Sequence, residues 1–107
     1  MSEAVAVTSA NFKETVLESS LPVLADFWAP WCVPCRMVSP LLDQLAEEHK
    51  DKMRVAKINV DEESQLATQF NIVSIPTIIL FHQGQVVKQQ IGAAPRKVFQ
   101  EMIQEYL

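Results

Sequence analysis

Two cysteines separated by two residues are the most chemically reactive side chains of this chain. Cys32 and Cys35 are its only cysteines among 107 residues, and Val33 and Pro34 lie between them. At this spacing the two sulfurs can bond to each other, or both can turn to one ligand. Because an apolar strand pattern precedes the pair and an apolar helical pattern follows it, the motif predicts a reversible dithiol/disulfide centre.

The junction between a strand and a helix predicts different roles for the two thiols. Free amide donors and the partial positive charge at a helix N-terminus favour a thiolate over a thiol at Cys32. We expect Cys32, the more exposed sulfur, to attack a target disulfide. Cys35, more buried and one helical turn later, would then resolve the mixed disulfide. The alternative is a purely structural disulfide, which would close a loop of two residues and constrain the chain little.

The elements that position this pair follow from the apolar pattern, which predicts one α/β domain over residues 1–107. Parallel strands with right-handed crossovers come first, and an antiparallel hairpin with its turn at 82–85 follows. The expected fold is a central mixed sheet of about five strands with helices on both faces. Thr8 or Ser9 is expected to cap the first helix. The predicted strands cover residues 3–7, 22–29, 53–60, 76–81 and 85–91, and the predicted helices cover 10–18, 32–49, 61–70 and 95 onward.

Composition and charge exclude several classes of function. A net charge of −4 does not favour a protein that binds nucleic-acid backbones, which needs a basic surface. Uninterrupted apolar runs, such as residues 78–81, are far too short to span a bilayer. The first four residues carry no positively charged segment, so we expect neither a secretory signal nor a membrane anchor. A close cysteine pair in such a chain indicates a reducing compartment, the cytoplasm or the stroma or matrix of a reducing organelle.

One charged residue interrupts each of two apolar strands. Asp26 lies between apolar neighbours, so burial should raise the pKa of its carboxyl group. The alternative is a strand-end aspartate that backbone amides satisfy. Lys57 lies between Ala56 and Ile58, and a surface lysine with a buried stem is nearly as good an interpretation as a functional one.

A series of short motifs runs along the chain in the order of these elements. They are Asp26-Phe27-Trp28-Ala29-Pro30-Trp31-Cys32, Pro34-Cys35-Arg36-Met37, Pro40, Lys57, Asn59-Val60-Asp61, Ile75-Pro76-Thr77 and Gly92-Ala93. This series resembles the thioredoxin family over essentially the whole chain, and it is far more specific than a Cys-x-x-Cys motif alone. The resemblance implies a mixed sheet flanked by four helices.

The resemblance also implies an activity and its partners. It implies a protein-disulfide reductase that donates electrons to disulfide-containing proteins and maintains cell redox homeostasis. Electrons would come from a thioredoxin reductase, linked either to NADPH or to ferredoxin. We expect no bound cofactor other than the redox-active disulfide, and a monomer with no membrane or nucleic-acid partner.

The resemblance assigns roles to residues outside the cysteine pair. It makes Asp26 the proton acceptor for Cys35. It also places Lys57 nearby, where the lysine charge would adjust the proton equilibrium of the Asp26 carboxyl group. It makes the Ile75–Pro76 peptide bond cis, which leaves the backbone of Ile75 free to pair with an extended substrate. Trp28, Met37 and Val38 are expected to be packing residues. The expected substrate-binding residues around the sulfurs are Trp31, Val33, Pro34, Ile75, Pro76, Gly92 and Ala93.

The chain departs from the family pattern at two positions near the cysteines. Val33 stands where the family usually has glycine, and its bulk would shift the reduction potential or narrow the range of partners. Ser74 stands where the family often has a smaller residue, which would alter docking. Neither difference removes a reacting group.

Three other interpretations remain open beside the reductase. Cys32, Cys35 and His49 fall near zinc-finger spacing, but a zinc site needs about four ligands, and His82 is far along the chain. An oxidant or isomerase of the same fold is a closer competitor, because the residues between the cysteines influence that balance. A binding module, in which turnover is incidental, would keep its effect without either thiol. The expected lack of a secretory signal and the retained Pro34 favour a reductant over an oxidant. The presence of both cysteines with Asp26 argues against a binding module.

Overall fold

The computed structural model describes residues 4–107, in which five strands alternate with four helices in the expected order. Most predicted strands and helices form close to their predicted bounds. The first helix is an exception described below, and the helix predicted over 61–70 begins only at Ser64, because the Glu63 N–H donates to the Asn59 carbonyl in a turn. The predicted first strand began at Glu3, which lies outside the described residues. The elements are β1 (Val5–Ala6), η1 (Lys13–Leu17), β2 (Val23–Trp28), α1 (Val33–Glu48), β3 (Arg54–Asn59), α2 (Ser64–Gln69), β4 (Thr77–His82), β5 (Gln85–Ile91) and α3 (Arg96–Gln104).

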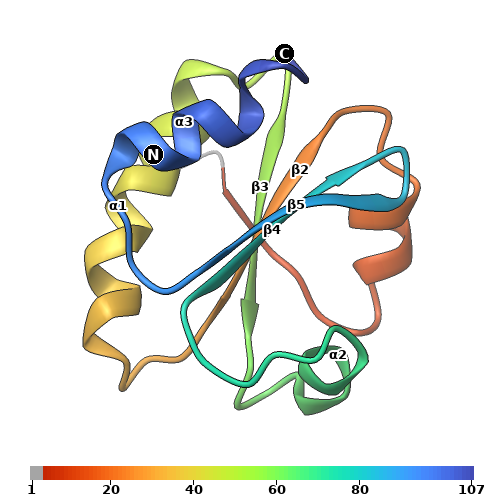
Figure 1. The fold of residues 1–107 in the computed structure, drawn as a ribbon. Helices are drawn as coiled ribbons and strands as arrows, with labels where there is room; N and C mark the ends of the chain where they lie inside the picture. Colours follow the sequence, from red (N-terminus) through yellow and green to blue (C-terminus); the bar gives the residue numbers. More distant parts are fainter. Residues whose placement is uncertain (1–3) are drawn as a thin grey trace.

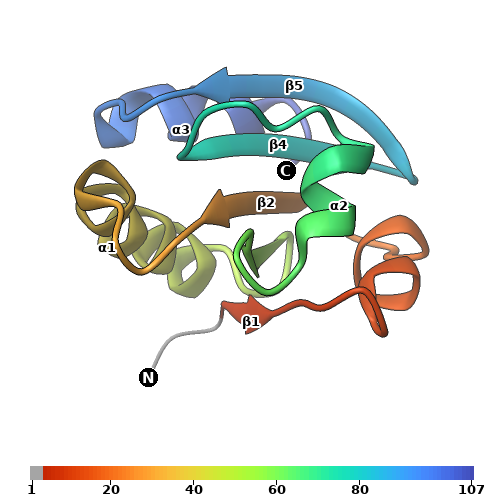
Figure 2. The ribbon, with the colours of Figure 1, turned by 90° about the horizontal axis from the view of Figure 1, so that it is seen from below.

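The strands form one mixed sheet in the order β1-β3-β2-β4-β5, with β1 and β5 at its edges (Figure 2). β3 runs parallel to both β1 and β2, whereas β4 runs antiparallel to β2 and β5. The central position of β2 explains its apolar sequence, because both of its faces are covered. The α/β class, the mixed sheet and its flanking helices are therefore as the sequence predicts.

The helices divide between the two faces of the sheet (Figure 1). One face, here called the α1 face, is covered by α1 and α3, and Leu24 lies on it. The opposite face, here called the α2 face, is covered by η1 and α2, and Ala25 lies on it. Because side chains alternate along a strand, Asp26 and Trp28 share the α1 face with Leu24. This alternation decides which residues of β2 lie under the helix that carries Cys35.

The first helix is shorter than predicted and has a different hydrogen-bond pattern. Its regular part spans Lys13–Leu17, where the Glu18 N–H donates to the Lys13 carbonyl, a wide π-type turn. Thr8 does not cap it: its hydroxyl accepts from the Ala10 N–H in the preceding turn. The side chain of Asn11 in turn accepts from the Thr8 N–H. Local side-chain bonds of this kind compete with helix formation, and the expected cap at Thr8 or Ser9 is wrong.

Two chain reversals are explained by residues with positive φ. Gln83 (φ 54°) and Gly84 (φ 78°) form the tight turn between β4 and β5, as the hairpin prediction requires. A Cβ atom at Gly84 would lie 3.0 Å from the Leu17 carbonyl oxygen, so η1 also requires glycine there. Asn71 (φ 56°) adopts the left-handed conformation just after α2. Within residues 4–107, no helix is both long and apolar enough to cross a membrane.

Candidate active site

The two cysteines lie at the N-terminus of α1 and form a disulfide. Their Cα atoms are 5.3 Å apart, within the normal range for a disulfide. Cys32 is the N-cap residue of α1, and its sulfur accepts a hydrogen bond from the Cys35 N–H at 3.2 Å. Such a donor stabilises negative charge on the Cys32 sulfur once the disulfide opens. The sulfur therefore occupies the place where a helix N-terminus favours a thiolate.

An apolar shell surrounds the disulfide. Cys32 is 4% exposed and Cys35 is 1% exposed, so the expected order of exposure holds, although both residues are buried in the oxidised protein. Ala29 packs against the pair, with Trp28 and Ile75 at its border. Trp28 is thus a packing residue, as predicted.

The segment at Ile75 approaches the cysteines from a distant part of the chain. The Ile75 carbonyl oxygen lies 3.8 Å from the Cys32 sulfur, although 43 residues separate them in sequence. The Ile75–Pro76 peptide bond is cis, as the family resemblance implied. The Gly92 N–H donates to the Pro76 carbonyl at 2.8 Å, which brings Gly92 beside this segment. Three of the expected substrate-binding residues therefore lie together next to the disulfide.

Asp26 is buried on the α1 face of the sheet, in the middle of β2. It is 1% exposed, and its Oδ1 atom has no hydrogen-bond partner among the described residues. Burial raises the pKa of this carboxyl group from 3.8 to about 7, while the positive charge of Lys57 lowers it and the negative charge of Asp43 raises it. A carboxyl group of this kind exchanges protons near neutral pH. The alternative of a strand-end aspartate bound by backbone amides does not describe this environment.

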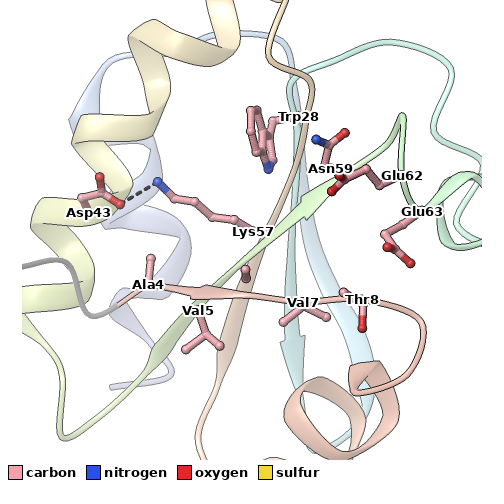
Figure 3. Close-up of a pocket in the computed structure, with 11 residues that line it drawn as sticks. Ala4, Val5, Val7, Thr8, Trp28, Asp43, Lys57, Asn59, Glu62 and Glu63 are labelled. Carbon is pink, nitrogen blue, oxygen red and sulfur yellow. Dashed lines mark ion pairs between the residues drawn. The ribbon is translucent and has the colours of Figure 1, made fainter.

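Lys57 occupies the position of β3 that pairs with Asp26 in the sheet register. Its ammonium nevertheless lies against α1, where Nζ is 2.6 Å from Asp43 Oδ1 and 2.5 Å from the Ser39 hydroxyl oxygen. Its side chain is 19% exposed, so it is not a freely solvated surface lysine. Figure 3 shows the Lys57 side chain reaching from β3 toward Asp43.

The rim of the disulfide carries several exposed apolar side chains. Trp31 is 65% exposed, and its Nε1 donates to Asp61 Oδ2 at 2.9 Å, which links the loop before α1 to the turn after β3. Val33 is 57% exposed, and Pro34 and Ala93 are also exposed. Pro76 is buried, so it supports this rim from below rather than adding surface.

Two residues near the site were missed or misassigned at the level of sequence. Met37 was expected to pack on the sheet, but it is 67% exposed and lines a pocket with Ala93 and Pro95. The helical period contained the signal, because the buried positions Val38 and Leu42 define a stripe that excludes Met37. Asp43 was not singled out, and no sequence pattern links it to Lys57, fourteen residues later on another element.

A shared metal site is incompatible with the helix that separates its candidate ligands. Cys32 and His49 cap opposite ends of α1, whose sixteen residues span roughly 24 Å at 1.5 Å per residue. Across residues 4–107, no group of three or more histidine, cysteine, aspartate or glutamate residues lies close enough to hold a metal ion.

Comparisons with known proteins agree with this geometry. The thioredoxin family model matches residues 3–105. Thioredoxin 1 of Synechococcus elongatus is 50% identical over 107 residues and covers both chains completely. Thioredoxin 1 of Nostoc is 47% identical over the same length, again with complete coverage of both chains. The M-type chloroplastic thioredoxin of Chlamydomonas reinhardtii is 48% identical over 105 residues, which are 98% of this chain and 75% of that protein.

Proteins of this family reduce disulfides in target proteins and are themselves reduced by a thioredoxin reductase. The Cys-x-x-Cys disulfide at a helix N-terminus, the five-stranded mixed sheet and these full-length similarities all lead to one assignment. The chain belongs to the thioredoxin family and is a thiol-disulfide oxidoreductase with protein-disulfide reductase activity.

Proposed function

We propose that Cys32 is the nucleophile and Cys35 the resolving thiol of this reductase. In the reduced protein, the Cys32 thiolate attacks one sulfur of a target disulfide, forms a mixed disulfide and releases the other target sulfur as a thiolate. Cys35 then loses its proton and attacks the Cys32 sulfur. The Cys32–Cys35 disulfide forms and the second target sulfur leaves as a thiolate. Two electrons have passed to the target, whose two thiolates take up the proton lost by Cys35 and one proton from solvent. The N-cap position of Cys32 is the observation that carries this assignment.

Asp26 is the proposed proton acceptor for Cys35 and the donor when the disulfide is reduced again. Its burial and its pKa of about 7 support this role, because such a carboxyl group can both take up and release a proton near neutrality. Lys57 has a secondary role, in which its positive charge adjusts the protonation equilibrium of the Asp26 carboxyl group.

Target proteins dock on the rim of the disulfide in this proposal. Trp31, Val33, Pro34 and Ala93 offer exposed surface, and Ile75 offers a carbonyl beside Cys32 to an extended segment of the target. Gly92 and Pro76 support the rim, joined by the hydrogen bond between them. The bulk of Val33 restricts which side chains can approach next to the target cysteine.

The remaining proposals concern the setting in which the protein works. A single domain over residues 1–107 works as a monomer with its disulfide as the only redox group. Its electrons come from an NADPH-linked or ferredoxin-linked thioredoxin reductase. It works in the cytoplasm, or in the stroma or matrix of a reducing organelle, and binds neither nucleic acid nor membrane. The similarity to cyanobacterial and chloroplastic thioredoxins supports this setting.

Trapping of the mixed disulfide tests the roles of the two cysteines. With Cys35→Ser, a protein disulfide such as that of insulin should accumulate as a covalent adduct on Cys32, because nothing remains to resolve it. The matched variant Cys32→Ser should form no comparable adduct. Equal trapping by both variants would overturn the assignment.

The reduction potential separates a reductant from an oxidant of the same fold. Equilibration with a defined thiol buffer should give a value near about −270 mV, the value established for thioredoxin. A value above about −180 mV would instead mark an oxidant or isomerase.

A further inference from the structure

The position of the Lys57 ammonium is unexpected for a residue that pairs with Asp26 in the sheet. The two residues are direct neighbours on adjacent parallel strands, and alternation places both on the α1 face. A lysine beside a buried carboxylate normally forms an ion pair with it. Here the ammonium instead contacts two side chains of α1, Asp43 and Ser39, and Asp26 Oδ1 has no hydrogen-bond partner among residues 4–107.

The surroundings leave the lysine side chain room to move. Lys57 lines a solvent-open pocket of about 330 Å³ between β1, β3 and α1, together with Trp28 and Asp43 (Figure 3). Glu62 and Glu63, in the turn before α2, line the same pocket. Figure 3 shows these two glutamates on the opposite side of the pocket from the ammonium, so the charged groups that face it are Asp43 from α1 and Asp26 from β2. Asp26 and Asp43 are therefore two alternative partners for one ammonium group.

We propose that Asp43, assisted by the Ser39 hydroxyl, is a positioning residue that holds the Lys57 ammonium against α1 and keeps Asp26 without an ion partner. A carboxylate without a cationic partner is the stronger base. It takes the proton of Cys35 more readily, and its protonated form returns that proton when the disulfide is reduced again. The proposal rests on the proton-acceptor role proposed for Asp26.

The contacts explain why Asp43 is suited to this position. Asp43 lies on the third turn of α1, two turns after Cys35, so one helix carries both the resolving thiol and the anion that holds the lysine. Its side chain is 36% exposed, whereas Asp26 is buried. A charged carboxylate costs less at the partly hydrated position, which favours the ion pair there over one with Asp26.

Direct titration of Asp26 tests this proposal independently of catalysis. The carboxyl carbon resonance of Asp26 in the oxidised full-length protein reports its midpoint by NMR. With Asp43→Asn, the midpoint should fall by about one pH unit or more, because a nearby anion is lost and Lys57 is free to approach Asp26. Ser39→Ala should cause a smaller fall in the same direction. The pH profile of insulin reduction should move with the midpoint.

A double variant separates positioning from the direct electric field of Asp43. In the Lys57→Met background, Asp43→Asn should change the Asp26 midpoint much less than it does alone, because its effect is transmitted through the lysine. Equal changes in both backgrounds, or no change in the single variant, would overturn the proposal. The matched control is Glu47→Gln, which removes the same charge from an exposed position of the same helix and should leave the midpoint unchanged.

Failure of this proposal can be distinguished from failure of the proposed function. If Cys35→Ser traps a target and Asp43→Asn leaves the Asp26 midpoint unchanged, only the positioning role is wrong. If the midpoint falls as expected and the pH profile of insulin reduction does not follow, the positioning role stands and Asp26 is not the proton acceptor.

Discussion

The two faces of the sheet are built from the same strands and differ in what they contain. The α2 face is apolar throughout its buried core. Four phenylalanine rings pack on it, two from strands and two from the cap residues of η1 and α2, and the contacting rings have centroids 5.4 to 6.1 Å apart. The α1 face has a similar apolar core, but at the end near the cysteines it carries Asp26 and Lys57. The comparison teaches that one face mainly contributes stability, while the other buries an ionisable carboxyl group for which we propose a role in proton transfer.

The largest effect is expected on the α2 face. Phe81 lies 5.4 Å from the Phe70 ring and 6.0 Å from the Phe12 ring and is fully buried. Phe81→Ala should lower the free energy of unfolding by about 3–5 kcal/mol, measured by urea denaturation. If the alanine variant does not fold, Phe81→Leu, with an expected cost below about 1.5 kcal/mol, takes its place. A shifted pH profile of insulin reduction in either variant would show that the faces are not separable.

The second effect concerns stability on the α1 face and depends on pH. The pKa of Asp26 is about 7 in the folded protein and 3.8 when unperturbed, so between these values the folded state holds a proton that the unfolded state has released. The free energy of unfolding therefore falls as pH rises from about 4 to 7 and is then level. Asp26→Ala should remove this fall and stabilise the protein at pH 8 by up to about 4 kcal/mol.

Urea denaturation at pH 5 and pH 8 checks this expectation. Asp26→Asn is the matched control, because it removes the charge and keeps the shape. The same Asp26→Ala variant should reduce insulin more slowly near neutral pH. A stability difference between variant and parent that is identical at both pH values would mean that Asp26 is not protonated near neutrality.

The smallest expected effect comes from comparing an exposed and a buried position of the same helix, Met37 and Val38 of α1. Met37→Ala should change stability by less than about 0.5 kcal/mol, because the side chain is exposed. Because Met37 lines a pocket with Ala93 of the proposed docking rim, the variant should lower kcat/KM for a protein disulfide roughly two- to fivefold, less than the tenfold that 1.4 kcal/mol represents. It should leave a small aromatic disulfide unaffected. Its neighbour Val38 is buried, and Val38→Ala should cost about 1–3 kcal/mol of stability. Equal losses with both disulfides would place Met37 outside the docking surface.

Prediction from sequence succeeded where the signal is local and periodic. The strands that contain Asp26 and Lys57 were predicted correctly, because continuous apolar runs are typical of strands covered on both faces. The helices α1 and α3 were predicted correctly from their apolar stripes. The first helix was predicted too long, because the bonds that Thr8 and Asn11 make to nearby backbone groups are invisible in an apolar pattern. Met37 was misassigned because its apolar character was given more weight than its angular position on α1.

The sequence by itself determined the reacting pair, because residues three apart at the start of a helix lie within one turn and their sulfurs meet without help from the rest of the chain. It also determined that an acid and a base interrupt buried strands. Only the tertiary structure decided that Asp26 and Lys57 are neighbours, that Ile75 reaches Cys32, and that Asp43 holds the lysine. These contacts depend on strand register and on the packing of α1 over the sheet, which join residues far apart in the chain.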